Sequence, residues 1–166
     1  ELLRDHQLLL SQVEDLRASL LALHPGAVAN LELAEGRLRA RMNAFWKDWR
    51  LHCLREEMGL FAEAQRLVAE VAEPDRPLAA FLAGEAEEDL SAHVGISKRM
   101  HEAITLVGEI ESEGQLAEPE LARLRSMVGI ALGLLSRHAA KEESLVFPTL
   151  ARALSPRQMA AVRTRL

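Results

Sequence analysis

The stretch HAAKEESLVFP, residues 138–148, places a histidine and a glutamate four residues apart in sequence that otherwise favours a helix. Positions four apart lie on one face of a helix, so His138 and Glu142 are expected to point the same way. A second stretch, HCLREEMGLFA, begins at His52 and repeats the spacing with Glu56. A single pair of this kind is compatible with an ordinary surface pair or a core histidine. Two pairs on separate helices predict a shared site.

The rest of the chain is also typical of helices. Alanine, leucine, glutamate and arginine dominate, and apolar residues recur at intervals of three and four. The motif Ser-Pro-Arg-Gln at 155–158 has N-capping residues and predicts a short helix after it. Breaks rich in proline and glycine predict four long helices before that motif, at 2–23, 34–72, 78–111 and 120–151. These lengths favour an all-α fold, an up-down-up-down antiparallel four-helix bundle with a short C-terminal fifth helix. The 166 residues are expected to form one domain.

An internal repeat relates two helix hairpins, at about 1–72 and 78–151. In each hairpin, a histidine in the first helix precedes the histidine of a His-x-x-x-Glu motif, by 46 and 45 residues. Each histidine lies about 18 residues from the turn of its predicted hairpin, which is about 27 Å along a helix. The following histidines are therefore expected at one level of the bundle: His6, His52, His93 and His138.

Four imidazoles and two carboxylates at one level form a set of metal-binding groups inside a helical core. Left unpaired, such buried groups destabilise the fold by several kcal/mol, and a bound metal removes that cost. Two divalent ions fit the count if each binds two imidazoles and if Glu56 and Glu142 bridge both, with an oxo or hydroxo solvent oxygen between the ions. Imidazole and carboxylate ligands with an open position suit iron. A structural zinc site is instead closed and usually rich in cysteine.

This arrangement resembles the hemerythrin-like (HHE) family, whose pattern is a histidine on helix 1, His-x-x-x-Glu on helix 2, a histidine on helix 3 and His-x-x-x-Glu on helix 4. The match covers nearly the whole chain and includes the hydrophobic-Phe-Pro close of the fourth helix. Two positions depart from it. Ala62 stands where proline is common in helix 2, so that helix is expected to continue. Ser97 stands where animal hemerythrins have a second helix-3 histidine.

The resemblance implies a non-haem di-iron protein that binds O₂ or a related diatomic molecule such as NO, for sensing, storage or stress response. A second hypothesis is a di-iron enzyme that reduces NO or peroxide or helps to repair damaged iron centres. A third is a structural bundle without metal, which the intact set of six ligands disfavours.

The third helix offers two histidines for one role. His93 matches the height of His138, whereas His101 lies eight residues further along, about 12 Å along the axis. His93 is therefore the expected ligand. His101 is expected to support the centre without binding the metal, to carry protons, or to be an ordinary residue at the boundary of the core.

Four further residues lie near the motifs, and none of them is expected to bind metal. Glu57 and Glu143 follow the bridging glutamates but rotate about 100° away, so solvated or supporting roles are expected rather than metal binding. Trp49 is expected either to wall the pocket or simply to pack. Cys53 is expected to behave as a small hydrophobic residue.

Composition excludes several classes of function. The formal charge is −5, and no basic stripe for nucleic acid or an anionic membrane surface is present. No apolar run approaches the roughly 20 residues that span a bilayer. Because a single cysteine cannot form an internal disulfide, a reducing cytoplasm is the expected compartment.

Overall fold

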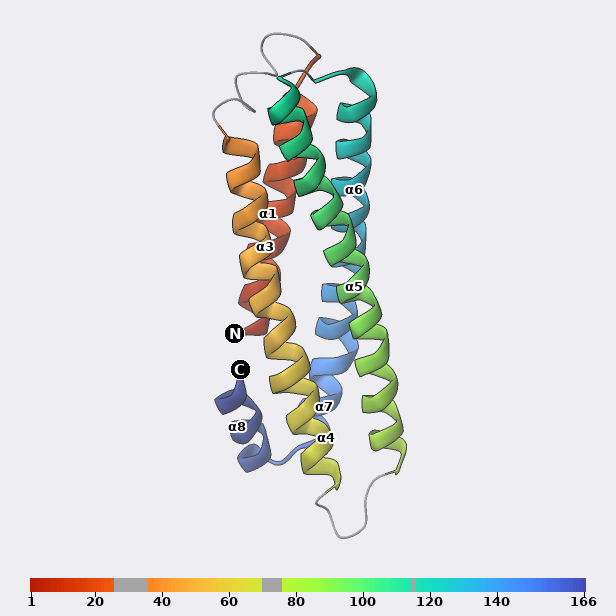
Figure 1. The fold of residues 1–166 in the computed structure, drawn as a ribbon. Helices are drawn as coiled ribbons and strands as arrows, with labels where there is room; N and C mark the ends of the chain where they lie inside the picture. The colour runs from red at the N-terminus through yellow and green to blue at the C-terminus, as the bar shows by residue number, and fades with distance from the viewer. Residues whose placement is uncertain (26–35, 70–75, 115) are drawn as a thin grey trace.

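The computed structural model describes residues 1–25, 36–69, 76–114 and 116–166, which are almost entirely helical (Figure 1). The all-α class expected from the sequence is confirmed. Two segments, η1 and η2, are π-helical, which means that the backbone makes one wider turn there. The elements are α1 (Leu2–Ala22), α3 (Arg37–Leu54), η1 (Arg55–Phe61), α4 (Ala62–Ala69), α5 (Arg76–Glu113), α6 (Glu118–Lys141), η2 (Glu142–Val146), α7 (Phe147–Ala153) and α8 (Pro156–Arg165).

The predicted helix boundaries hold to within a few residues wherever the structure describes them. α1 ends one residue before the predicted end, and α5 extends the third helix by two residues at each end. The second predicted helix includes α3, η1 and α4, so it continues past Ala62 as expected. The two predicted ends of this second helix lie outside the described residues. Most residues of the first and second predicted turns also lie outside them. The fourth predicted helix includes α6, η2 and α7.

The four long helices lie side by side, with α1 along the upper part of the molecule only and α8 below the N-terminus (Figure 1). α1 packs against α3 and α6, and α5 packs against the same two helices. Each long helix therefore contacts two of the others, and their apolar faces enclose a common interior.

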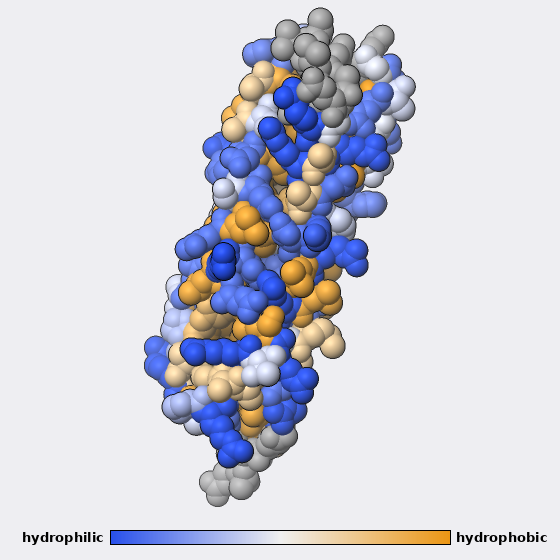
Figure 2. Space-filling view, turned by 90° about the vertical axis from the view of Figure 1, so that its left-hand side faces the viewer, coloured by the Kyte–Doolittle hydropathy of each residue, from blue (hydrophilic) through white to orange (hydrophobic). Residues whose placement is uncertain are grey.

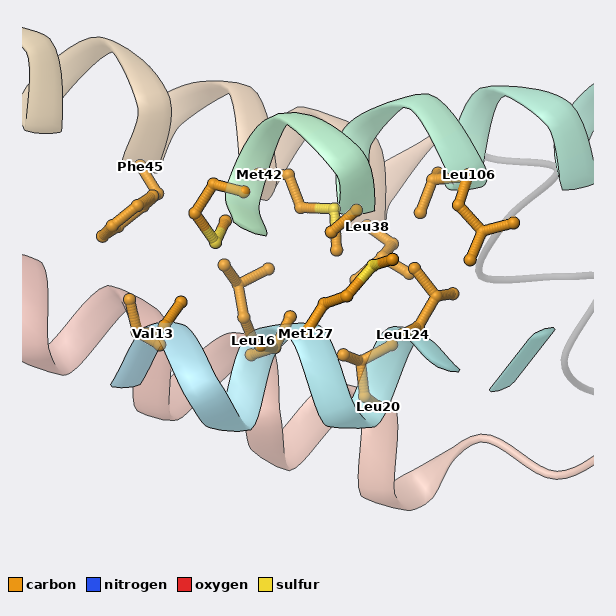
Figure 3. Packing of buried hydrophobic residues seen from close by; sticks show 14 of the residues in the cluster. Val13, Leu16, Leu20, Leu38, Met42, Phe45, Leu106, Leu124 and Met127 are labelled. Atoms are coloured by element: carbon orange, nitrogen blue, oxygen red, sulfur yellow. The ribbon is translucent and has the colours of Figure 1, made fainter. Parts of the chain in front are cut away.

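One apolar cluster fills most of that interior (Figure 3). Leu16 from α1, Leu38 and Met42 from α3 and Leu124 from α6 are almost fully buried, and their side chains point toward one another. Burying each such side chain stabilises the fold by about 1.5–3 kcal/mol relative to leaving it exposed. This cluster extends from Leu20 near one end of the molecule down to Trp49.

A second apolar cluster occupies the other end, and the polar groups of the two His-x-x-x-Glu motifs lie between the clusters. Leu60, Leu82 and Leu150 belong to this second cluster. Along α3 and η1, buried Trp49 of the first cluster precedes His52, and Leu60 of the second cluster follows Glu56. The sequence therefore places a layer of buried histidine and glutamate between two hydrophobic cores.

The short helix α8 closes the second cluster from outside. Ser155 caps it as predicted: its hydroxyl accepts a bond from the Gln158 backbone N–H, and the Gln158 side chain accepts one from the Ser155 backbone N–H. The end of α8 lies directly against Gly59 of η1. A Cβ at that position would be 3.0 Å from the Leu166 side chain and 3.1 Å from the Arg165 carbonyl oxygen. Glycine at 59 therefore allows the close approach.

Gly59→Ala is expected to lower the melting temperature, although alanine favours helix by about 1 kcal/mol over glycine. The added methyl group has to push the C-terminus away from η1. Gly129→Ala is the matched control, because a Cβ there meets nothing within 4 Å. That variant should raise the melting temperature by about 2–4 °C. Thermal denaturation checks both, and a rise for Gly59→Ala would show that α8 does not pack there.

The surface seen in Figure 2 carries hydrophilic side chains along its whole length, with hydrophobic residues between them. Within the described part of the chain, none of the helices has the length and apolar character needed to cross a membrane.

Candidate metal centre

The two π segments begin at the two His-x-x-x-Glu motifs. η1 starts at Arg55, one residue before Glu56, and η2 starts at Glu142 itself. A π turn changes the direction of every residue that follows it, and such turns occur frequently at functional sites. In η2 it comes just before Pro148, which cannot donate the backbone hydrogen bond of a regular α-helix. The same local irregularity in both hairpins indicates that the sequence shapes the helices around the motifs.

Glu56 lies at the middle of the cluster and is fully buried. Its Oε2 is 3.2 Å from the Nε2 of His52, 3.0 Å from that of His93 and 3.4 Å from that of His138. Its Oε1 is 3.5 Å from the Nε2 of His6. One carboxylate thus faces all four histidines, which come from α1, α3, α5 and α6 as the predicted register requires.

Glu142 spans the cluster from another side. Its Oε2 is 3.1 Å from the Nε2 of His6 and 3.9 Å from that of His138. The ring centroids of His6 and His52 are 4.9 Å apart, and those of His93 and His138 are 5.1 Å apart. These are the two shortest distances between histidine rings among those that the structure describes, and they pair the histidines within each hairpin. Glu142 touches one histidine of each pair, which is the position of a bridging carboxylate.

Three of the four histidines have a second carboxylate on their other ring nitrogen. The Nδ1 of His6 is 3.0 Å from Glu143 Oε1, and the Nδ1 of His93 is 2.8 Å from Glu57 Oε1. These contacts give Glu57 and Glu143 the supporting role that sequence reasoning left open. Such a carboxylate fixes the tautomer and orientation of the imidazole and leaves Nε2 free for a metal ion.

Asp89 supplies the third of these carboxylates, and sequence reasoning missed it. It is 6% exposed and lies in α5, four residues before His93. Its Oδ1 is 2.9 Å from His138 Nδ1, and its Oδ2 is 3.3 Å from His93 Nε2. The signal was present in the sequence: Asp89 and His93 have the four-residue spacing used to find the other motifs, in the order acid then histidine.

Trp49 forms one wall of the cluster and is fully buried. Its ring centroid is 5.3 Å from that of His52 and 5.1 Å from that of His93. Its indole Nε1–H donates a hydrogen bond of 3.0 Å to the Ser97 hydroxyl. Ser97 occupies the position at which a second histidine of the third helix was considered. It orients Trp49 instead of facing the centre.

Without metal, protons occupy the cluster. Burial lowers the pKa of His6, but the nearby carboxylates of Glu142, Glu56 and Glu143 outweigh it and raise that pKa to about 10. Burial also lowers the pKa of His93 and His138, but contacts with Cys53 and Glu56 raise that of His93 to about 11, and contacts with Asp89 and Glu56 raise that of His138 to about 9. Burial raises the pKa of Glu142 to about 8, and the nearby Glu56 charge also raises it. Metal ions therefore have to displace these protons on binding.

His52 and Glu56 behave differently. Burial lowers the pKa of His52 to about 3, so its imidazole is neutral at pH 7. Burial acts to raise the pKa of Glu56, but hydrogen bonds from His138, His6 and His93 hold it well below the usual value. The middle of the cluster is thus a carboxylate that contacts three protonated imidazoles and the neutral imidazole of His52.

The metal-free protein is expected to lose stability as the pH rises from 7 to 10. The raised pKa values of His6, His93 and His138 contribute stability that is fully present below the unfolded value of about 6.5 and is lost as the pH passes through about 9 to 11. Thermal denaturation of chelator-treated protein at both pH values checks this. A melting temperature that stays constant or rises would contradict the protonated cluster.

Several buried polar atoms of the cluster have no hydrogen-bond partner among the described residues. They are His6 Nε2, His52 Nδ1, Glu56 Oε1, Asp89 Oδ2 and both oxygens of Glu142. Each such atom costs about 1–3 kcal/mol when it is buried without a partner. The cluster therefore fits a group of cations better than it fits a metal-free core, and two overlapping sets of its residues could hold a metal ion.

A cavity of about 170 Å³ leads from the surface between α5 and α6 to one side of the cluster. Asp89, His138 and Glu142 line its inner part, and Glu85 and Glu88 line it nearer the surface. Lys141 forms ion pairs with Glu85, at 2.8 Å, and with Glu88. Small molecules and ions can therefore approach the His93 and His138 pair through a lining that combines four carboxylates with two basic side chains, Arg137 and Lys141, and several apolar residues.

Two other residues singled out in the sequence lie outside the two ligand sets that contain Glu56, although Cys53 forms a third potential set with Glu57 and His93. His101 is exposed, and its ring centroid is 6.5 Å from that of Trp46. It belongs to neither of the overlapping sets of potential ligands found among the described residues. Cys53 is half-buried beside His93, and burial raises the pKa of its thiol.

The structure brings together the six residues predicted as ligands and adds Asp89 to them. The arrangement is a buried histidine and glutamate cluster able to hold metal ions. Comparisons with known protein families, with curated proteins and with solved structures find no match to this chain.

Proposed function

We propose that the chain is a non-haem di-iron protein of the hemerythrin-like type, which binds O₂ or a related molecule such as NO in sensing, storage or stress response. In this proposal the four long helices form an up-down-up-down bundle. The observation that carries it is the convergence of four histidine Nε2 atoms on Glu56, with Glu142 reaching one histidine of each pair.

The donor set supports iron. The two ligand sets that contain Glu56 consist of imidazole nitrogens and carboxylate oxygens, and a third potential set at their edge joins the Cys53 thiol to Glu57 and His93. An iron pair would supply redox-active ions with room for a small ligand. The protein's own residues supply the rest: Glu57, Glu143 and Asp89 orient three imidazoles, and the two apolar clusters keep bulk water away.

Absorption spectroscopy tests the proposal. The metal-free protein is loaded anaerobically with two equivalents of Fe(II), exposed to O₂ and then deoxygenated. We expect a charge-transfer band that appears with O₂ and disappears when O₂ is removed, with a parallel experiment for NO. The absence of any spectral change with either gas would exclude the proposed binding function.

A di-iron enzyme is the second candidate, and the carboxylates that line the cavity favour it. Reduction of NO or peroxide consumes protons, and Asp89, Glu85 and Glu88 all line the cavity beside the cluster. Repeated turnover of NO or peroxide in the same experiment, with irreversible bleaching of the O₂ band, would favour this candidate over reversible binding.

A further inference from the structure

Asp89 differs from Glu57 and Glu143 in how it faces the cluster. Each of those two glutamates contacts the Nδ1 of one histidine through a single oxygen, and their side chains are 39% and 43% exposed. Asp89 is buried, and only one of its oxygens is engaged with an outer nitrogen, the Nδ1 of His138. The other, Oδ2, has no hydrogen-bond partner within the described residues and lies beside His93 Nε2.

The position of Oδ2 is that of a metal ligand. Two donor atoms on one ion, each about 2.1 Å from it, lie roughly 3.0–3.4 Å apart for angles between a right angle and the tetrahedral angle. Asp89 Oδ2 is 3.3 Å from His93 Nε2, and Glu56 Oε2 is 3.0 Å from the same nitrogen. These three residues and His138 form one set of potential ligands whose donor atoms all lie within 4.8 Å of one another.

The first hairpin has no counterpart of Asp89. The internal repeat relates His6 to His93 with an offset of 87 residues, and the same offset relates Leu2 to Asp89. Leu2 is buried in the second apolar cluster. In agreement, His52 Nδ1 has no hydrogen-bond partner among the described residues, whereas His138 Nδ1 has Asp89.

The residues around the two histidine pairs also differ between the two hairpins. On the first-hairpin side, Leu2 and Phe147 line an apolar pocket that Met159, Val162 and Leu166 from the C-terminal part of the chain cover. On the second-hairpin side, Asp89 lines the cavity that opens between α5 and α6. From solvent, a divalent cation can therefore reach the Asp89 oxygen that is unpartnered among the described residues.

We propose that Asp89 is a direct ligand of the ion held by His93 and His138, so that this position binds a divalent cation first and more tightly than the position at His6 and His52. The inference rests on the proposed metal centre. With Glu56 and Glu142 bridging both ions as proposed, Asp89 gives the position at His93 and His138 one carboxylate more than the position at His6 and His52. An added carboxylate ligand is a principal means by which proteins raise the affinity of a cation site.

Titration of the metal-free protein with Co(II), followed by visible absorption and calorimetry, tests the proposal. The wild-type protein should bind two ions in two steps at least tenfold apart in affinity. Asp89→Asn should weaken the tighter step by about a hundredfold and leave the other step unchanged, so that the order of binding reverses or the steps merge. The asparagine amide oxygen still accepts the bond from His138 Nδ1. A change of less than about threefold would mean that Asp89 only orients that ring, and would overturn the proposal.

Two further measurements keep the test decisive. Glu57→Gln is the matched control, because Glu57 contacts His93 only through Nδ1, and both steps should stay within about tenfold of wild type. His6→Ala should keep the tighter step, and His93→Ala should lose it. If His6→Ala instead removes the tighter step, the proposed order of metal binding is wrong. This comparison remains decisive if Asp89→Asn does not fold. A wild-type protein that binds fewer than two ions would contradict the metal centre itself, whereas two equal steps would contradict only the role of Asp89.

Discussion

Replacing Glu56 by alanine is expected to remove both metal ions from the protein. Its carboxylate lies within 3.5 Å of the Nε2 atoms of all four histidines, so no ion position is complete without it. The change should lower the affinity for both ions by more than about a hundredfold, since losing even a supporting group around a metal costs 10–100-fold. Elemental analysis after iron reconstitution and gel filtration should fall from about two irons per chain to nearly none.

The control for this change is His101→Ala, which alters an exposed histidine of α5 outside the cluster. It should keep both irons and leave the absorption spectrum unchanged. If Glu56→Ala retains two irons, or if His101→Ala loses them, the cluster is not the metal site and the register of α5 has been misassigned.

Removing the metal is expected to destabilise the folded protein by several kcal/mol. The unfolded chain does not hold the six ligands together, so binding free energy becomes folding free energy. Each ion present at a hundred times its dissociation constant adds about 2.7 kcal/mol, which corresponds to roughly 5–11 °C in melting temperature for a chain of this size. Thermal denaturation with and without a chelator at pH 7 measures the difference.

Glu142→Ala gives the matched comparison for this second prediction. The variant loses the carboxylate that reaches one histidine of each pair, so added iron should raise its melting temperature much less than that of the wild type. If the chelator leaves the wild-type melting temperature unchanged, the buried histidines and glutamates stabilise the fold without any metal.

Periodicity and spacing were sufficient to predict the helical class and to find the residues that converge. The His-x-x-x-Glu spacing identifies one helix face without any knowledge of packing. The register argument also held, because α5 continues for 20 residues past His93 and α6 begins 20 residues before His138. The capping motif at Ser155 depends only on neighbouring residues, so it too could be read locally.

Features that depend on tertiary packing could not be predicted in this way. The π turns at Glu56 and Glu142 result from a balance between the helix backbone and the ligands packed inside it, and no residue type specifies them. The role of Gly59 depends on the C-terminus docking against η1. Asp89 was missed because an aspartate four residues before a histidine is common on exposed helix faces, and only the packed structure shows that this one is buried.

The most direct test of the account is the metal content of the protein after anaerobic loading with Fe(II) and removal of unbound metal. The convergence of His6, His52, His93 and His138 on two shared carboxylates predicts about two irons per chain. A saturating ratio near one or near zero, or a clear preference for zinc over iron, would contradict the proposed di-iron centre.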